Sequence, residues 1–345
     1  MLHFHFFIYL AYLCALKSAV ALIGIHEVLT EYMKKITILI PAYNEAQSVP
    51  LMYAELQRVT GEMPQYEWEY LFVDDGSTDE TASAIGKLRS ADQRVRLVKL
   101  SRNFAKENAM PAGFDRADGD ALVIMDCDLQ DPADVIPMLT EEWERGFQDV
   151  YARRRSRGRE PWLRKQLTRL YYSLLQRSAR FDVLPNVGDF RLLSRECVEA
   201  LRQLRESQRY TKGLFCWIGF RKKEVLFDRS DRAAGKSRFS YGALMRLALD
   251  GLISFTTAPL RLSILCGLLV SLAAFVYLIY VVVKTLAFGE PVQGYPTIVT
   301  LILFLGGMQL LALGIIGEYV ARIYNESKRR PVYIVESDSA EKSPN

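Results

Sequence analysis

Short apolar runs alternate with helical patterns between residues 35 and 127 of the chain. Apolar runs of strand length predict buried strands, and longer stretches with apolar residues at every third or fourth position predict helices. The strands predicted in this way are 36–40, 70–73, 95–100 and 121–125, and the helices are 46–59, 78–88 and one that begins near Phe104 with Asn103 as its cap. Strands that alternate with helices predict an α/β domain in which a parallel sheet carries helices on both faces.

Two long uncharged runs lie near the C-terminus, at residues 262–283 and 297–317. Each has about the 20 residues that a helix needs to cross a hydrocarbon core of about 30 Å. Neither run has a polar face, so a pair of buried core helices is the weaker interpretation. The short segment between them, 284–296, carries proline and glycine turn signals. The pattern therefore predicts a transmembrane hairpin of two helices.

Basic residues lie on both outer sides of this hairpin. Arg261 precedes the first run, Arg322 and the basic residues 328–330 follow the second, and the connecting segment has only Lys284. The positive-inside rule places both ends of the hairpin, and the domain before it, in the cytoplasm. We therefore expect a multi-pass protein of the inner (cytoplasmic) membrane.

The first 32 residues form a separate apolar segment. It is mostly apolar from Phe4 to Ile25, with Lys17 as an interruption and no basic region ahead of it, which argues against a cleaved signal peptide. Two interpretations stay open, a third membrane helix or a chain that starts at Met33. A close pair of glycines in the second apolar run, Gly306 and Gly307, would allow helices to pack together and is a weak indication of a homo-oligomer.

The remaining chain divides by composition. The predicted parts are a soluble domain at 33–240, a juxtamembrane helix at 241–260, two transmembrane helices at 261–322 and a cytosolic tail at 323–345. The tail is polar after Val335, and we expect it to be disordered there. Residues 162–181 form a basic amphipathic stretch that suits a membrane surface or an ordinary surface helix packed on the sheet.

Charge and cysteine content limit the classes of partner. A net charge of +4 is too weak to indicate a nucleic-acid-binding protein. The basic residues cluster between 153 and 169, which suits anionic lipid. The five cysteines contain no CxxC pair, so reduced thiols in a cytosolic compartment are the default interpretation.

Polar side chains follow three of the predicted strands, at residues 41–45, 74–77 and 126–128. Ligands of such sheets bind outside the carboxyl ends of the strands, so we expect these residues to face one crevice. Asp126 and Asp128 would repel each other without a nearby cation, and hard carboxylate oxygens select Mg²⁺ or Mn²⁺, often together with substrate phosphates. No GxGxxG follows a strand and no GxxxxGK[ST] occurs, which argues against dinucleotide-binding and P-loop proteins.

Four segments of the predicted α/β domain form an ordered set of motifs, ITILIPAYNE at 36–45, FVDDGSTD at 72–79, SRNFAKEN at 101–108 and IMDCDLQDP at 124–132. This set resembles glycosyltransferase family 2, whose members have a GT-A (Rossmann-like) fold. Further segments at 187–191, 212–215, 234–238 and 248–260 resemble the polyprenyl-phosphate branch of that family, which includes bactoprenol glucosyl transferases and, more distantly, dolichol-phosphate mannosyltransferases. The resemblance runs from about residue 33 to residue 322 with its motifs in order.

The resemblance implies a role for each residue that matches a motif. Donor-binding residues would be Pro41, Tyr43, Glu45, Asp74, Asp75, Lys106 and Asp126. Asp126, Asp128 and Gln130 would hold Mg²⁺ or Mn²⁺, Asp189, Arg191 and Asp128 would be catalytic, and Arg153, Arg164 and Lys236 would grip the acceptor phosphate. One departure is Pro111, which should kink or end the helix that begins near Asn103.

The resemblance also implies an activity, the inverting transfer of a sugar from a nucleotide donor to a polyprenyl (undecaprenyl) phosphate in the membrane. Glucose from UDP-glucose is the first expectation, and a modified amino sugar such as 4-formamido-arabinose is the alternative. No Gln-x-x-Arg-Trp motif occurs, which argues against a processive polysaccharide synthase. A membrane scaffold that only binds nucleotide is disfavoured because the acidic and basic site residues are all present.

Overall fold

The computed structural model describes residues 33–155, 166, 176, 184, 187–207, 209–228, 258–288 and 294–340. The predictions for the N-terminal segment 1–32, for nearly all of the amphipathic stretch 162–181 and for most of the juxtamembrane segment 241–260 lie outside these residues.

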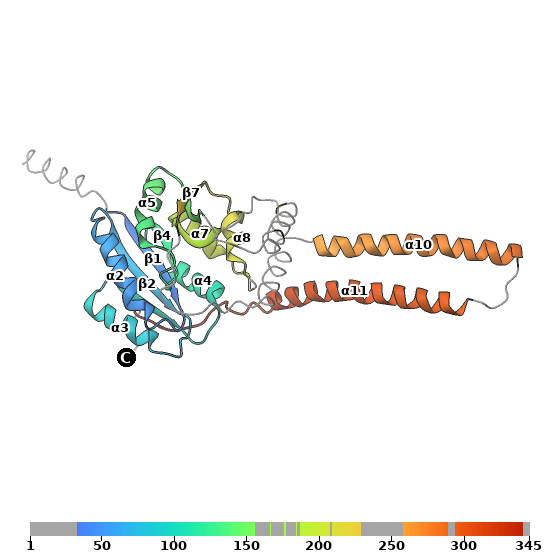
Figure 1. Ribbon diagram of the computed structural model, residues 1–345. Helices are drawn as coiled ribbons and strands as arrows, with labels where there is room; N and C mark the ends of the chain where they lie inside the picture. The colour runs from blue at the N-terminus through green and yellow to red at the C-terminus, as the bar shows by residue number, and fades with distance from the viewer. Residues whose placement is uncertain are drawn as a thin grey trace, which may run out of the picture.

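A mixed sheet forms the centre of the soluble domain (Figure 1). Within the described residues it has eight strands in the order β7-β5-β6-β4-β1-β2-β3-β8. The four predicted strands are present and run parallel, as β1 Lys35–Ala42, β2 Glu67–Asp74, β3 Val95–Leu100 and β4 Ala121–Ile124. Four more strands, which the sequence did not predict, are β5 Asp149–Arg154, β6 Val187–Ser194, β7 Lys222–Phe227 and β8 Val335–Asp338. The predicted strands thus form a parallel core, and the sheet as a whole is mixed because β6 is antiparallel to β4 and β5 and β8 is antiparallel to β3.

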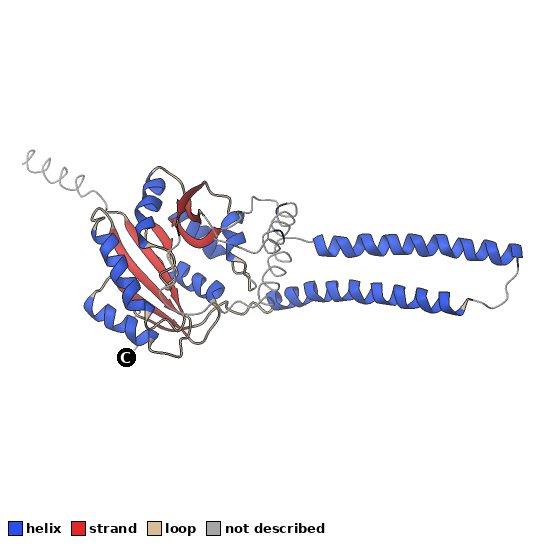
Figure 2. Ribbon diagram, viewed as in Figure 1, coloured by secondary structure: helices blue, strands red, loops and turns tan. Residues whose placement is uncertain are grey.

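Helices cover both faces of this sheet, as predicted (Figure 2). Alternate residues of β1 face opposite cores, because side chains along a strand point to opposite sides. Ile38 belongs to the core that includes Met52, whereas Leu39 belongs to the core that includes Met110 and Phe114. The helices of the domain are α2 Ser48–Gly61, α3 Thr81–Ala91, α4 Lys106–Arg116, the 3₁₀ turn η1 Ala133–Val135, α5 Ile136–Glu144, α7 Arg195–Gln203 and α8 Thr211–Trp217.

Helix α4 does not end at Pro111, which was one of the two effects, a kink or an end, expected from its sequence. It continues to Arg116, and the residues from Ala109 to Phe114 are all buried. Gly113 permits the helix to lie directly on β1, since a Cβ at this position would be 2.2 Å from Leu39 Cδ1. The burial of this face offsets the hydrogen bond that proline cannot donate.

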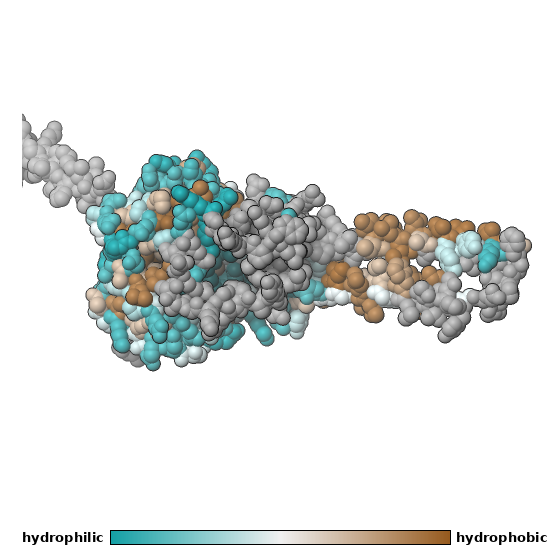
Figure 3. Space-filling view, in the orientation of Figure 1, coloured by the Kyte–Doolittle hydropathy of each residue, from teal (hydrophilic) through white to brown (hydrophobic). Residues whose placement is uncertain are grey.

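Two long helices, α10 Ala258–Phe288 and α11 Tyr295–Ser327, extend from the domain as an antiparallel hairpin (Figures 1 and 3). They contain the two predicted spans. In the described part of the chain, Phe304–Ser327 is a helical stretch long and apolar enough to cross a bilayer, and a shorter apolar stretch covers Leu265–Tyr277. None of the apolar window of Phe304–Ser327 is buried, so it is not a core helix.

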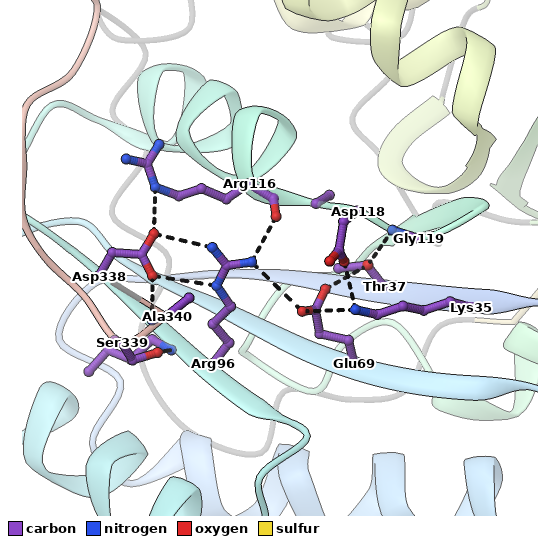
Figure 4. Close-up of polar contacts among 12 residues, drawn as sticks. Lys35, Thr37, Glu69, Arg96, Arg116, Asp118, Gly119, Asp338, Ser339 and Ala340 are labelled. Carbon is purple, nitrogen blue, oxygen red and sulfur yellow. Dashed lines mark hydrogen bonds and ion pairs between the residues drawn. The ribbon is translucent and has the colours of Figure 1, made fainter. Parts of the chain in front are cut away.

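The chain returns to the sheet after the hairpin, so the expectation of a disordered end after Val335 was wrong for residues up to 340. Strand β8 pairs with β3, and the nearly fully buried carboxylate of Asp338 accepts hydrogen bonds from Arg96 and Arg116 (Figure 4). Burial raises the pKa of Asp338, but the Ala340 N–H and the two guanidinium groups lower it further, so that it lies below its usual range. The polar composition of this tail did not reveal that the tail pairs with the edge of the sheet at β3.

Replacing Asp338 with alanine is expected to destabilise the domain by about 2 kcal/mol, the typical contribution of hydrogen bonds to charged groups in a part-buried setting. That corresponds to roughly 4–8 °C in the melting temperature of a domain of this size, measured by tryptophan fluorescence on detergent-purified protein at neutral pH. Glu336→Ala is the matched control on the same strand, because its pair with Lys99 is half exposed and should contribute little. Equal melting temperatures for the two variants would contradict a clamping role for Asp338.

Candidate functional site

Three strand ends meet at one pocket, as the sequence predicted. The pocket lies at the carboxyl ends of β1, β2 and β4, and its lining consists of Pro41, Ala42, Tyr43, Glu45, Asp75, Lys106, Asp126, Cys127 and Asp128. Seven of these nine residues are among the predicted site residues. The sequence did not single out Ala42 and Cys127, which line the pocket because they adjoin predicted residues.

The loops around this pocket hold strained backbone. Asn44, Ala105 and Leu129 have φ angles of 55°, 70° and 59° without being glycine. Each directly precedes a predicted site residue, Glu45, Lys106 or Gln130. Left-handed backbone at such residues costs about 1–3 kcal/mol and persists where the surrounding structure fixes it, commonly at functional sites. These three positions are thus an independent indication that the pocket is functional.

Hydrogen bonds join the loop that follows β1 to the loop that follows β2. The Asn44 side-chain oxygen accepts a hydrogen bond from the Thr78 N–H at 2.8 Å, and the Asn44 N–H donates to the Ser77 hydroxyl at 2.9 Å. The Glu45 N–H donates to the Thr81 hydroxyl at 2.9 Å. Gly76 has a φ of 66°, and a Cβ there would be 2.3 Å from the carbonyl carbon of Arg102. In the FVDDGSTD sequence, the residues after β2 thus form a loop that packs against the loop after β1 and against Arg102.

Asp74 and Asp75 lie in different environments. Asp74 is fully buried, accepts the Ser77 N–H at 3.0 Å and does not line the pocket. Asp75 lines the pocket and accepts the Phe104 N–H at 2.7 Å, which fixes the loop that leads into α4. Burial raises the pKa of Asp75 to about 6, against the opposing effect of that N–H group. The structure therefore brings Asp75, and not Asp74, to the pocket surface.

Lys106 lies between two carboxylates. Its Nζ is 2.5 Å from Asp126 Oδ1 and 2.6 Å from Asp189 Oδ2, so α4, β4 and β6 meet at this ammonium group. Burial lowers the pKa of Lys106, but Asp189 and Asp126 raise it well above its usual range. Burial likewise raises the pKa of Asp189, but Lys106 lowers it to about 2. Both groups are therefore charged at neutral pH, and Asp189, which was predicted to be catalytic, lies close to Lys106 and Asp126 of the predicted donor-binding set.

The acidic loop after β4 has the oxygen chemistry of a divalent cation site. Asp128 Oδ1 accepts the Gln130 N–H at 3.2 Å, and Gln130 Oε1 is buried without a hydrogen-bond partner among the described residues. Burial, and to a smaller extent the negative charge of Asp126, raises the pKa of the neighbouring Asp131 to about 6. Among the described residues, no three His, Cys, Asp or Glu side chains converge on one metal position. The loop fits a cation that takes its other ligands from substrate phosphates.

Arg191 lies beneath the site and not on its surface. Its side chain is buried, donates to Asp149 at 3.2 Å and to the Gly188 carbonyl at 3.1 Å, and stacks on the Phe215 ring with the guanidinium carbon 3.8 Å from the ring centroid. It is therefore placed to support β6, two residues after Asp189. The sequence analysis did not identify Asp149 as the partner of Arg191. The only indication in the sequence is that Asp149 is a charged residue directly before the apolar residues of β5.

The predicted acceptor residues are only partly placed. Arg153 pairs with Glu224 at 2.6 Å across β5 and β7. Arg164 and Lys236 lie outside the described residues. Another contact that the sequence did not predict joins α4 to α8, because the Glu107 carboxylate accepts the N–H of Thr211 at 2.9 Å and also its hydroxyl.

Comparisons with known proteins give consistent matches. Residues 37–202 match the family model described as glycosyl transferase family 2, and residues 258–323 match the model described as GtrB C-terminal hairpin. Similar curated proteins are the bactoprenol glucosyl transferase of Shigella phage SfV (42% identical, covering 88% of this chain and 99% of that protein), the putative glycosyltransferase CsbB of Bacillus subtilis (42%, 87% and 91%) and an uncharacterized glycosyltransferase of Synechocystis (40%, 87% and 94%). The matches thus span both the soluble domain and the hairpin.

Proposed function

The chain belongs to glycosyltransferase family 2, and from this membership we propose that it transfers glucose from UDP-glucose to undecaprenyl phosphate with inversion at the anomeric carbon. It is a glycosyltransferase with a GT-A, Rossmann-like fold and a C-terminal membrane hairpin. Glucose and the lipid carrier are proposed because proteins named bactoprenol glucosyl transferase are 41–42% identical to this chain over nearly their whole length.

One observation in the structure carries the proposal, the juxtaposition of Lys106 with Asp126, just after the carboxyl end of β4, and with Asp189, near the amino end of β6. This arrangement joins the acidic loop, which suits a nucleoside diphosphate with its cation, to a buried carboxylate on the other side of the lysine. Two anionic substrates that must approach each other need positive charge between them, which Lys106 and a cation held by the acidic loop would supply.

The residues of the pocket have distinct proposed roles. Tyr43, Glu45 and Asp75 would contact the nucleoside of the donor. Asp126, Asp128 and Gln130 would hold a divalent cation, Mg²⁺ or Mn²⁺, which when bound neutralises charge on the donor diphosphate. Lys106 would then offset the charge that develops on the departing diphosphate.

The acceptor is a phosphate monoester, which is already an anion at neutral pH and needs positioning more than deprotonation. One of its oxygens would attack the anomeric carbon from the side opposite the diphosphate. A bond forms between that oxygen and the carbon while the bond from the carbon to the β-phosphate oxygen breaks, and UDP leaves. Because Asp189 has a lowered pKa and already binds Lys106, we propose that it orients the reacting groups and does not accept a proton.

The hairpin would keep this reaction at the lipid headgroups. We propose that the domain faces the cytoplasm, because the basic residues flank the outer ends of α10 and α11 and nucleotide sugars are cytosolic.

The test is transfer from radiolabelled UDP-glucose to undecaprenyl phosphate by the purified full chain, first with Mg²⁺ and then with EDTA. We expect labelled lipid that disappears with the chelator and returns when Mg²⁺ or Mn²⁺ is restored. A panel of other nucleotide sugars, including the amino-sugar donor with 4-formamido-arabinose, runs in parallel. Labelling by another sugar would overturn the choice of glucose, and labelling that is indifferent to EDTA would overturn the cation.

A further inference from the structure

Helix α8 carries a lysine, Lys212, that interacts electrostatically with Asp189 but forms no ion pair or hydrogen bond with the described residues through its ammonium group. The side chain of Lys212 is half-buried. The other cations near the site are engaged. Lys106 binds two aspartates, Arg153 binds Glu224, and Arg191 binds Asp149.

The packing of α8 on β6 directs Lys212 toward Asp189. Arg191 of β6 stacks on Phe215 of α8. Asp189 lies two residues before Arg191 and is therefore on the same face of the strand, and Lys212 lies three residues before Phe215 and is therefore on the same face of the helix. The next pair along this interface is Asp189 with Lys212. Their electrostatic interaction agrees with this placement, because Lys212 helps Lys106 to lower the pKa of Asp189.

Glu107, on the helix α4 that also carries Lys106, fixes the first turn of α8. Its carboxylate holds both the N–H and the hydroxyl of Thr211, the first residue of α8 and the neighbour of Lys212. Glu107 itself follows Lys106, so the first turn of α4 sends one side chain to the donor pocket and the next to α8. Lys106 and Lys212 both act on Asp189, but Lys212 is not among the residues that line the donor pocket.

We propose that Lys212 binds the phosphate group of the lipid acceptor and thus completes the acceptor side of the site. A half-buried ammonium that has no direct hydrogen-bond or ion-pair partner among the described residues favours an anionic ligand, because burial of a charge is offset only by direct contacts of this kind. The acceptor phosphate is the anion that must reach Asp189 from the side opposite the donor. The inference rests on the proposed function in one respect, since it assigns the site of that reaction's acceptor.

The experiment measures binding without any sugar transfer. The full chain in detergent is titrated with farnesyl phosphate, with the uncharged farnesol and with UDP, for the wild type and for the variants Lys212→Met, Lys212→Arg and Lys223→Met. Lys223 is a matched control because it is a half-buried lysine on β7 that lies over the Phe147 ring, outside the site. Lys212→Met is expected to weaken farnesyl phosphate binding by about 10- to 100-fold, the usual effect of losing a hydrogen bond between charged groups.

The same variant should leave farnesol and UDP binding within about 2-fold of the wild type, and Lys212→Arg should restore most of the farnesyl phosphate affinity, because it keeps the charge. Lys223→Met should change none of these constants. Unchanged farnesyl phosphate binding in Lys212→Met, or an equal loss of UDP binding, would overturn the proposal. Wild-type protein that binds farnesyl phosphate through Lys212 but transfers no glucose would overturn the proposed function and leave this inference standing.

Discussion

Replacing Asp128 with asparagine is expected to lower the rate of sugar transfer by about 1,000-fold or more while the protein stays folded and bound to the membrane. Asparagine has the same shape as aspartate but carries no negative charge and is a poorer ligand for Mg²⁺. A cation that stabilises a departing diphosphate supplies several kcal/mol, and about 4 kcal/mol corresponds to a factor of about 1,000 in rate. Asp128 lines the pocket and belongs to a loop, so the substitution removes no core packing.

The measurement is the turnover number at saturating donor as a function of Mg²⁺ concentration. Asp134→Asn is the matched control, because Asp134 lies six residues further along the chain, carries the same charge and forms only an exposed ion pair with Arg58. We expect the control to retain wild-type turnover. Wild-type turnover in Asp128→Asn at the same Mg²⁺ concentration would show that the acidic loop does not hold the cation.

The parts of the fold that the sequence predicted are those in which local pattern and tertiary environment agree. Strands β1, β2 and β4 are buried along most of their length, so each contains a short apolar run that can be recognised without knowledge of its neighbours. Strand β8 has the sequence VESD and forms only because the edge of β3 and the guanidinium groups of Arg96 and Arg116 receive it. No local pattern contains that information.

The candidate site shows the same division. Residues at strand ends were predictable, since the carboxyl edge of an α/β sheet collects them whatever their exact contacts. The contacts that these residues make could not be predicted. Lys106 was expected to approach the nucleotide, and its position between Asp126 and Asp189 depends on β6, a strand that the sequence did not predict. Arg191 was expected at the reaction centre, and its burial depends on Asp149, 42 residues earlier in the chain.

The buried ion pair of Asp149 and Arg191 is expected to contribute strongly to the stability of the domain. Replacing Asp149 with alanine is expected to destabilise the domain by about 3–5 kcal/mol, because it leaves the Arg191 charge buried without its counter-charge. The Asp149 side chain is fully buried and that of Arg191 is 2% exposed, so water cannot take the place of the lost carboxylate. For a domain of this size the loss corresponds to a fall of roughly 10 °C or more in melting temperature.

The double variant Asp149→Leu with Arg191→Met distinguishes the effect of the ion pair on stability from its effect on sugar transfer. It removes both charges and keeps apolar volume against Phe215, so it should melt within a few degrees of the wild type although the single variant does not. Glu144→Ala, which breaks an exposed ion pair with Lys34, is the surface control and should cost less than about 1 kcal/mol. If Asp149→Ala melts no lower than Glu144→Ala, the pair does not stabilise β6. If instead the double variant regains stability but not transfer, Arg191 matters to the reaction through the position that it gives Asp189, two residues away on the same strand.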